Sequence, residues 1–222
     1  MFAKKSTVSH SGNPGISLNK MNLFESEFCR IIKTDGEVDY YGPVFTVSKA
    51  SAYLQSLLSH ITWEHDIAIM FGKRIITKRM VAWYGDRDFS YTYSKTTKYA
   101  LPWTTELQAL KSLVEAKSGL TYNSCLLNLY HDGNEGMGWH SDDERSLESG
   151  SSISSLSFGA PRHFSFKHKV SKETVSVELE TGSLLVMKGA TQKYWLHALP
   201  KTTKVKLPRI NLTFRTMAIP ED

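Results

Sequence analysis

The chain has 222 residues, of which 41% are hydrophobic and 22% charged, a composition typical of a globular protein with one large domain or two small ones. No apolar run approaches the roughly 20 residues that span a bilayer, and no apolar segment follows the N-terminal lysine pair, so neither a membrane protein nor a secreted one is expected. Two cysteines without a CxxC motif argue against a disulfide scaffold, and the net charge of +5 permits a polyanionic partner without requiring one.

The N-terminal region predicts a tail, short strands and one helix. Residues 1–20 are rich in Ser, Asn, Gly and Lys and carry no acid, which is typical of a mobile tail. Short strands are expected on either side of the turn Lys33-Thr-Asp-Gly36. A helix with Ser48 as its N-cap should follow. Its apolar residues recur at helical spacing: Tyr53, Leu54, Leu57, Leu58 and Ile61.

Two apolar runs flank Phe71-Gly-Lys-Arg74 and predict a hairpin with its turn near Gly72. Two interpretations of Phe71 stay open. It is either a core aromatic beside solvated cations, or an apolar wedge at a base stack whose neighbouring cations contact phosphate. The next strand ends at the turn Gly85-Asp86, and aromatic residues interleaved with lysines follow. That pattern suits base stacking and strand packing equally well.

A second helix is predicted where Thr105-Glu-Leu-Gln108 matches a capping box. Gly119 is suited to end this helix, and we expect the helix to be structural. Its apolar face consists of Leu107, Leu110, Leu113 and Val114.

Almost all of the remaining chain predicts short strands separated by turns with Gly or Pro, which is typical of a sandwich or jelly roll. With two helices upstream, the expected fold class is α+β: a double-stranded β-helix (jelly-roll) core with two flanking helices. The expected strands lie within residues 125–130, 153–158, 163–168, 175–179, 184–187 and 208–215.

A candidate metal site begins with His140 and Asp142, which point to the same side of an extended segment. His197 is the best candidate for a third ligand. Two histidines and one carboxylate on one face of a metal form the arrangement of non-haem Fe(II) oxygenases, although ligand type alone leaves Zn(II) open. The glycines just before the pair, Gly133, Gly136 and Gly138, are expected to let the backbone approach a ligand closely.

The last predicted strand alternates strictly, with Arg209, Asn211, Thr213 and Arg215 on one face. This face is either a solvated outer surface or, beside a metal site, the lining of a polar cavity. In a cavity, two arginines are suited to hold a dicarboxylate, because guanidinium groups pair with carboxylates through two hydrogen bonds. Asn128 and Tyr130 also share a face and are candidates to bind the same ligand.

These motifs together resemble the AlkB-like alkylated-nucleic-acid repair dioxygenases, a branch of the Fe(II)/2-oxoglutarate oxygenases. The resemblance runs from about Phe71 to Met217 and rests on four matches: Asn128-Leu-Tyr130, Gly138–Glu144, Ile153–Phe158 with Arg162-His-Phe, and Arg209–Arg215. It implies iron on His140, Asp142 and His197. It also implies 2-oxoglutarate against Asn128, Tyr130, Arg209, Asn211, Thr213 and Arg215, with Arg209 on the distal carboxylate.

The resemblance further implies a substrate side. Asp143 and Glu144 resemble the acids that face a flipped base, and Trp139 is assigned to substrate as well. Phe71-Gly72-Lys73 and Tyr84-Gly85-Asp86 resemble a nucleotide-recognition lid. We therefore expect a tail at 1–20, an N-terminal extension and lid at 21–100, and an oxygenase core at 101–222, with 21–222 folding as one domain.

The implied reaction is oxidative dealkylation of bases such as 1-methyladenine and 3-methylcytosine in DNA or RNA, with Fe(II), 2-oxoglutarate and O2. Basic residues at Lys73, Arg74, Lys78 and Arg79 are expected to hold the nucleic-acid backbone. The alternatives are an oxygenase acting on protein or a small molecule, and an inactive nucleic-acid binding module. A monomer is expected, cytoplasmic in a bacterium or nuclear in a eukaryote.

Overall fold

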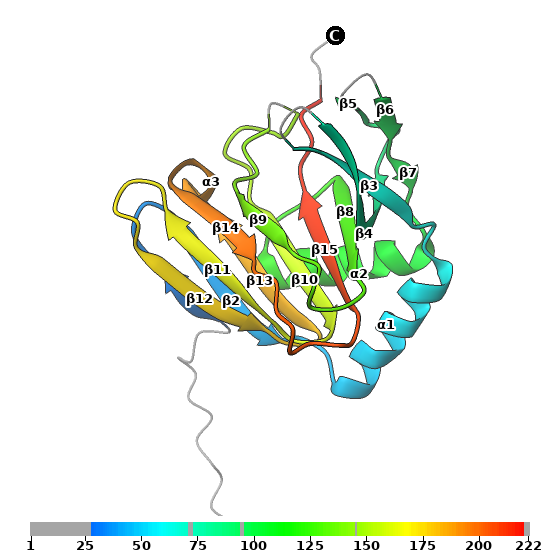
Figure 1. Cartoon of the computed structure of the whole chain (residues 1–222), viewed down its shortest axis with the longest axis horizontal. Coiled ribbons are helices and arrows are strands. Elements are labelled where there is room, and N and C mark those ends of the chain that lie inside the picture. Colours follow the sequence, from blue (N-terminus) through cyan, green and yellow to red (C-terminus); the bar gives the residue numbers. More distant parts are fainter. Residues whose placement is uncertain (1–27, 71–72, 94–95, 145, 220–222) are drawn as a thin grey trace, which may run out of the picture.

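The structure is a computed structural model that describes residues 28–70, 73–93, 96–144 and 146–219. Its core is two antiparallel sheets that face one another (Figure 1). The major sheet has the order β1 (Cys29–Ile32), β2 (Glu37–Pro43), β13 (Ser183–Lys188), β10 (Ile153–Gly159), β15 (Arg209–Arg215), β8 (Ser124–Tyr130), β4 (Lys73–Gly85) and β3 (Glu64–Met70), with β7 (Leu101–Pro102) parallel to β4. The minor sheet has the order β12 (Thr174–Leu179), β11 (Arg162–His168), β14 (Trp195–Leu199) and β9 (Met137–His140).

This arrangement confirms the expected jelly-roll core with flanking helices. The outward face of the major sheet is apolar, since alternate residues such as Leu127, Leu156 and Leu212 are fully buried there. Helices α1 (Val47–His60) and α2 (Thr105–Ser118) supply Leu57 and Leu110 to the same core. The polar residues of these strands are therefore directed toward the other sheet.

Helix α1 begins two residues earlier than predicted. Its N-cap is Thr46, not Ser48, because Thr46 has an extended backbone and its hydroxyl accepts the Lys49 N–H at 3.4 Å. Val47 and Ser48 are thus already helical, although they precede the apolar residues from which the helix was predicted.

Helix α2 shows a similar shift at its start and none at its end. Thr104 caps the helix by accepting the Leu107 N–H at 3.2 Å, so the predicted capping box at Thr105 and Gln108 is wrong by one residue. Gly119 ends the helix with φ 70°, a left-handed conformation that glycine adopts at little cost, as predicted.

A short third helix, α3 (Thr191–Tyr194), was not predicted, because four residues are too few to establish a helical period. It joins β13 to β14 across the gap between the two sheets. The Thr191 hydroxyl accepts the Glu37 N–H at 3.0 Å and also contacts the carbonyls of Glu37 and Lys188. The turn between β1 and β2 therefore fixes the position of α3.

Strands β1, β2 and β13 are joined by a buried carboxylate as well as by backbone pairing. Asp39 has a fully buried side chain, and its oxygens lie 2.7 Å from Arg30 Nε and 3.0 Å from Lys188 Nζ. Burial alone would raise the pKa of the Asp39 carboxyl, but the hydrogen bonds and charges of Arg30 and Lys188 lower it below its usual value. The ionised carboxylate thus stabilises this edge of the fold.

Strands β3 and β4 form the predicted hairpin, with Met70 paired to Lys73. The turn itself, and with it Phe71 and Gly72, lies outside the described residues, so the two interpretations of Phe71 stay predictions. A second hairpin, β5 (Ser90–Tyr93) with β6 (Thr96–Tyr99), extends from the same region (Figure 1). Among the described residues, every helix is too short or too polar to cross a lipid bilayer.

Candidate active site

Three side chains form the expected metal cluster at the open edge of the minor sheet. His140 ends β9 and is the register partner of His197 on β14, while Asp142 lies two residues beyond His140. The Nε2 atoms of His140 and His197 each lie 3.9 Å from an oxygen of Asp142. All three candidate ligand atoms lie within 4.8 Å of one another. The structure therefore brings together residues that are more than 50 positions apart in the sequence.

Both imidazoles direct Nε2 toward this cluster. His140 donates its Nδ1 proton to the Gly138 carbonyl at 2.8 Å, and this hydrogen bond orients the ring with Nε2 toward Asp142. Burial lowers the pKa of His197 to about 4, although the nearby Asp142 opposes the shift. A neutral imidazole is the form that binds a metal, and the lowered pKa keeps His197 in that form near neutral pH.

Asp142 divides its two oxygens between different neighbours. Oδ1 accepts a hydrogen bond from Arg215 Nη2 at 2.9 Å, whereas Oδ2 is the oxygen nearest His197. Burial alone would raise the pKa of Asp142, but Arg215, His197 and His140 together lower it, so the carboxyl is ionised. One oxygen can thus bind a metal while the other keeps its arginine partner.

A polar floor on the major sheet faces this cluster. Adjacent strands place Tyr130 opposite Arg209 and Asn128 opposite Asn211, all directed away from the helices. Strand β10 adds two residues that the sequence did not single out: Ser157, which accepts from Arg209 Nη2 at 2.9 Å, and Ser155. Ser155 donates to Asn211 Oδ1 at 2.8 Å, and Asn211 Nδ2 donates to Thr213 at 2.8 Å. The predicted 2-oxoglutarate residues therefore lie on one connected surface.

Arg209 is the strongest sign that this floor receives an anion. Its side chain is almost fully buried, and burial lowers its pKa to about 10. Its hydrogen-bond partners, Ser157 and Asn211, are neutral, and its Nε has no partner among the described residues. A buried guanidinium without a carboxylate is costly, and a bound carboxylate would offset that cost.

The residues present thus fit both implied groups. His140, Asp142 and His197 supply the donor set of a ferrous site, and Arg209 with Tyr130 supplies a buried cationic end for a dicarboxylate. The buried Asn128 Oδ1 also lacks a hydrogen-bond partner among the described residues. Arg215 Nη2 contacts Asp142, while its buried Nε has no hydrogen-bond partner among the described residues, so its contact with 2-oxoglutarate stays a prediction.

The glycines before β9 have a different role from the predicted one. A Cβ on Gly133 would lie 2.2 Å from the Thr202 carbonyl oxygen, and one on Gly136 would lie 2.4 Å from that of Leu199. The close approach is therefore to the end of β14 and the β14–β15 loop and not to a ligand. The predicted physical reason is therefore wrong for Gly133 and Gly136, whereas Gly138 has open space around it and its role in ligand approach stays a prediction.

Arg162 holds the same loops in place and was not predicted as a site residue. It is buried, and its guanidinium donates to the carbonyls of Glu135 at 3.0 Å and Pro200 at 2.7 Å. The only sequence signal was its place in a motif that carried the family resemblance. A buried arginine whose partners are backbone carbonyls cannot be recognised from residue types, because every residue has a carbonyl.

The structure does not bring all of the expected substrate residues to the metal cluster. Asp143 and Glu144 are exposed directly beyond Asp142. Trp139 lies on the opposite side of β9 from His140, where Lys167 covers its ring, so the structure does not bring it to the metal cluster.

The structure also separates the other expected lid residues from the cluster. Tyr84 is buried in the core beside α2, and Gly85 packs against Phe89. Asp86 accepts hydrogen bonds from Trp103 at 2.6 Å and from Lys111 at 3.2 Å. Lys73 begins β4, beside the undescribed turn.

Comparison with known proteins identifies the family. The sequence model of the 2OG-Fe(II) oxygenase superfamily matches residues 38–215, and the chain belongs to this superfamily. A solved structure titled "The structure of OsALKBH1" shares its fold, with a TM-score of 0.54 and 16% identity over 77% of this chain and 94% of the other.

Curated relatives place the chain in the AlkB-like branch of the superfamily. It is 39% identical over 181 residues to mouse (Mus musculus) "Alpha-ketoglutarate-dependent dioxygenase alkB homolog 3", covering 77% of this chain and 63% of the relative. It is 44% identical over 154 residues to Bos taurus "DNA oxidative demethylase ALKBH2", covering 66% of this chain and 55% of the relative. The human (Homo sapiens) protein of that name is 37% identical over 201 residues, covering 86% of this chain and 77% of the relative. The chain thus spans less than two thirds of the length of the first two relatives.

Proposed function

We propose that this protein is an Fe(II)/2-oxoglutarate-dependent dioxygenase that removes N-alkyl groups from bases such as 1-methyladenine and 3-methylcytosine in DNA or RNA. The observation that carries the proposal is the cluster of His140, Asp142 and His197 facing a floor whose buried Arg209 lacks an acidic partner among the described residues. The names of the relatives, which include DNA oxidative demethylases, support the choice of a nucleic-acid substrate.

In this proposal the chain contributes geometry and charge. His140, Asp142 and His197 hold the iron. The residues that bind 2-oxoglutarate are Asn128, Tyr130, Arg209, Asn211, Thr213 and Arg215. Bound Fe(II), 2-oxoglutarate and O2 supply the oxidation of the N-alkyl group, with release of succinate and carbon dioxide. The hydroxylated alkyl group then leaves as formaldehyde and the base is restored. Arg215 keeps the Asp142 carboxylate ionised and oriented.

Two physical points support a methylated base as the substrate: the charge of nearby residues and the low cost of flipping such a base. Asp143 and Glu144 lie exposed directly after the ligand carboxylate, where they suit a cationic ring such as 1-methyladenine or 3-methylcytosine. A base whose pairing edge is methylated has already lost its Watson–Crick pairing, so its extrusion from a duplex costs less than that of a normal base. The lid role of Phe71, Gly72 and Lys73, with Phe71 as a wedge, remains part of the proposal.

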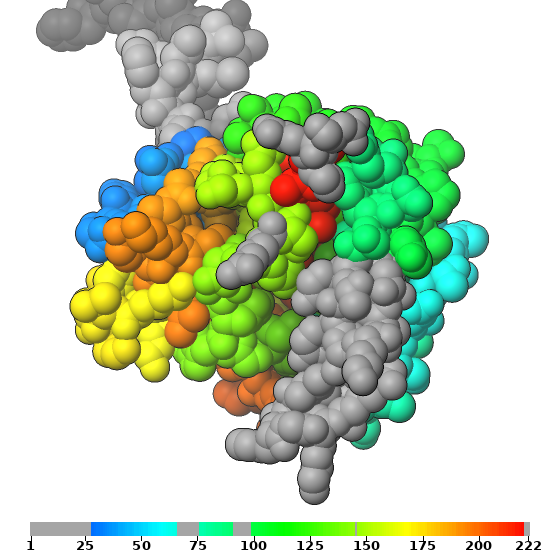
Figure 2. All heavy atoms as spheres, turned by 90° about the horizontal axis from the view of Figure 1, so that it is seen from above, coloured from blue at the N-terminus to red at the C-terminus, as the bar shows by residue number. Residues whose placement is uncertain are grey.

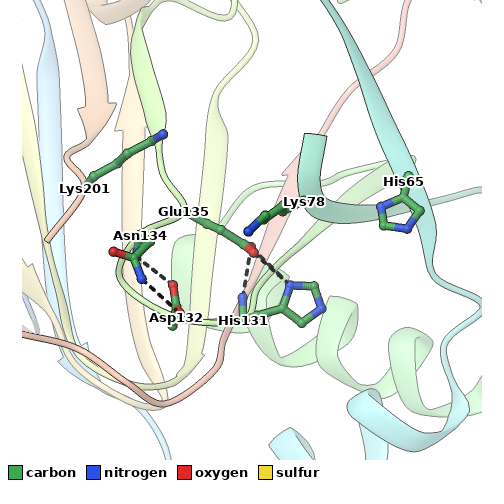
Figure 3. A pocket seen from close by; sticks show the side chains of 7 residues that line it. All are labelled: His65, Lys78, His131, Asp132, Asn134, Glu135 and Lys201. Carbon is green, nitrogen blue, oxygen red and sulfur yellow. Dashed lines mark hydrogen bonds and ion pairs between the residues drawn. The ribbon is translucent and has the colours of Figure 1, made fainter. Parts of the chain in front are cut away.

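A cavity beside the loop that joins β8 to β9 suits the nucleic-acid backbone. It has a volume of about 590 Å³, and Figure 3 shows Lys78 and Lys201 approaching it from different strands and loops. Neither lysine makes a hydrogen bond or an ion pair with another described residue. The lining residues are His65, Lys78, His131, Asp132, Asn134, Glu135 and Lys201.

The two acids of this cavity are already engaged within their own loop. Asp132 accepts the Asn134 N–H at 2.7 Å and its side-chain amide at 3.1 Å, and these bonds lower the pKa of Asp132. Glu135 accepts the His131 N–H at 3.0 Å and lies 3.0 Å from the His131 ring nitrogen (Figure 3). The two lysines therefore remain available for phosphate oxygens, which lysine binds as a point charge.

The decisive experiment measures formaldehyde and succinate from the purified protein with Fe(II), ascorbate and 2-oxoglutarate. Its substrates are methylated single- and double-stranded DNA and RNA oligonucleotides. We expect equal amounts of both products with at least one oligonucleotide, and no product from Asp142→Ala. Nucleic-acid affinity of Asp142→Ala should stay close to that of the parent. Succinate formed only with a protein or small-molecule substrate would replace this proposal, and binding without any succinate would favour an inactive module.

We also propose that the protein acts as a monomer, in the cytoplasm if its source is a bacterium and in the nucleus if it is a eukaryote. In support, the residues assigned to the iron and to 2-oxoglutarate all come from one chain. Light scattering during size-exclusion chromatography tests the oligomeric state, and a dimer mass at micromolar concentration would contradict it.

A further inference from the structure

The ligand carboxylate of Asp142 lies on a segment that the sheet does not hold. Strand β9 ends at His140, so the ladder with β14 does not extend to Asp142. The backbone N–H of Asp142 is instead donated to the side chain of Gln192, at 2.9 Å from Oε1. Figure 2 looks onto this edge, where the orange atoms of the α3 region lie near the yellow-green atoms of the chain after β9. Helix α3 therefore holds the backbone of Asp142, which lies beyond the end of the β9–β14 pairing.

A lysine from another loop completes this contact. Lys169 Nζ donates to the Ser141 hydroxyl at 3.0 Å and to the Gln192 carbonyl at 2.9 Å, and it lies 3.8 Å from the Asp143 carboxylate. It thus spans the residues on both sides of Asp142 and the helix that supports it.

Gln192 and Lys169 are themselves held in place. The Gln192 amide donates to Met187 Sδ at 3.4 Å, and its neighbour Thr191 is fixed to the backbone of Glu37. The backbone N–H of Lys169 donates to the Tyr194 carbonyl at 2.8 Å. The pair is therefore anchored through α3 to the first residue of β2, which precedes the ligands in the sequence.

We propose that Gln192 and Lys169 are positioning residues that set the direction of the Asp142 carboxylate and so the affinity of the site for its metal. The inference rests on the proposed role of His140, Asp142 and His197 as ligands. Partners of this kind orient a ligand without touching the metal, and their loss typically lowers metal affinity about 10- to 100-fold. Neither residue contacts the 2-oxoglutarate floor in the described structure, so the effect should appear in metal binding first.

The test is a Co(II) titration of the metal-free protein, followed by visible absorption, with a thermal melt of each metal-free variant. Gln192→Leu removes the acceptor for the Asp142 N–H, and Lys169→Met removes the bridging ammonium. We expect each to raise the Co(II) dissociation constant about tenfold or more and to alter the Co(II) absorption bands. Gln192→Glu keeps an acceptor oxygen at the same position and should retain parental affinity.

The matched control is Lys193→Met, because Lys193 belongs to the same helix but lies over the Tyr194 ring instead of the metal segment. We expect it to bind Co(II) like the parent. The positioning role is refuted if Gln192→Leu and Lys169→Met bind Co(II) as tightly as the parent. It is also refuted if Lys193→Met loses affinity equally, or if affinity falls only in variants whose metal-free form melts near the assay temperature.

A further variant distinguishes a failure of the proposed metal site from a failure of the positioning role. Asp142→Ala should abolish tight Co(II) binding whatever the role of Gln192. If Asp142→Ala still binds Co(II) tightly, the proposed metal site is wrong. If only Asp142→Ala loses binding, the metal site stands and the positioning role of Gln192 and Lys169 is wrong.

Discussion

Replacing Arg209 by Met should strongly lower the affinity for the co-substrate while changing the free energy of unfolding only slightly. The guanidinium is almost fully buried and its hydrogen-bond partners, Ser157 and Asn211, are neutral. Among the described residues no acid contacts this buried charge, so we expect a bound ligand to neutralise it. Methionine keeps much of the apolar length of the side chain while removing the charge and the donors.

The magnitude follows from the surroundings of Arg209. Burial lowers its pKa from 12.5 to about 10, which corresponds to roughly 3 kcal/mol against the charged form. The Arg209→Met variant is relieved of that cost but loses hydrogen bonds to Ser157 and Asn211, at about 1 kcal/mol each. The free energy of unfolding of the ligand-free variant should thus stay within about 2 kcal/mol of the parent. Loss of a buried charged contact to 2-oxoglutarate should cost about 2–5 kcal/mol, or at least about 30-fold in affinity.

Isothermal titration of 2-oxoglutarate into the Mn(II)-loaded protein under nitrogen measures the affinity, and urea unfolding of the ligand-free protein measures the stability. Two controls bracket the result. Arg209→Lys keeps the charge without the planar fork and should bind with intermediate affinity. Ser157→Ala removes one hydrogen-bond partner of Arg209 and should change affinity only a few-fold.

Two outcomes would refute this reasoning. If Arg209→Met binds 2-oxoglutarate within twofold of the parent, the buried guanidinium does not hold the co-substrate. If the free energy of unfolding of the ligand-free variant falls by far more than 2 kcal/mol, the charge of Arg209 is compensated inside the protein and is not reserved for a ligand.

Three further predictions concern the glycines before the metal ligands, the buried Asp39 and the lysines of the cavity. Gly136→Ala should lower the free energy of unfolding, measured in urea, by about 2 kcal/mol or more, because its Cβ would meet a carbonyl oxygen at 2.4 Å. Gly138→Ala should be tolerated, and equal losses of stability in the two variants would contradict the role assigned to Gly136. Asp39→Asn should lower the free energy of unfolding by about 2 kcal/mol at neutral pH. Because the folded pKa of Asp39 is depressed below 3.8, its contribution is present above that pH and lost as pH falls through the folded pKa, so the two proteins should converge in acid. Lys78→Ala with Lys201→Ala should weaken oligonucleotide binding and flatten its salt dependence without changing the affinity for 2-oxoglutarate; an unchanged salt slope would exclude the cavity as a phosphate site.

Much of the fold could be predicted because its signals are local and periodic. The strict alternation of β15 placed Ile210, Leu212 and Phe214 on one face, and all three are fully buried against the helices. Gly119 ended α2 for the reason expected, since only the backbone conformation of that residue was needed. Signals within one segment were therefore sufficient to predict the type of these elements, although the N-caps of α1 and α2 lie two residues and one residue earlier than predicted.

Features that depend on two distant segments were missed or misread. Helix α3 is too short for a period, yet it carries the Gln192 contact to Asp142. The glycines Gly133 and Gly136 were associated with a ligand, although the partner is the chain around the β14–β15 loop. Arg162 donates to backbone carbonyls, and because every residue has a carbonyl, residue types cannot predict these contacts. In each case the missing information was the identity of the neighbour.

The two arginines of β15 show this limit most clearly. Alternation places Arg209 and Arg215 on the same face, and the sequence predicted that both would hold one dicarboxylate. Their tertiary neighbours differ, because Arg215 meets the Asp142 carboxylate at 2.9 Å whereas the hydrogen-bond partners of Arg209 are neutral. Both guanidinium groups still have an Nε without a partner among the described residues, so both stay assigned to the anionic co-substrate. Only Arg215 also contacts the proposed metal ligand Asp142, so loss of Arg215 is expected to disturb the metal site as well, whereas loss of Arg209 should affect the co-substrate alone.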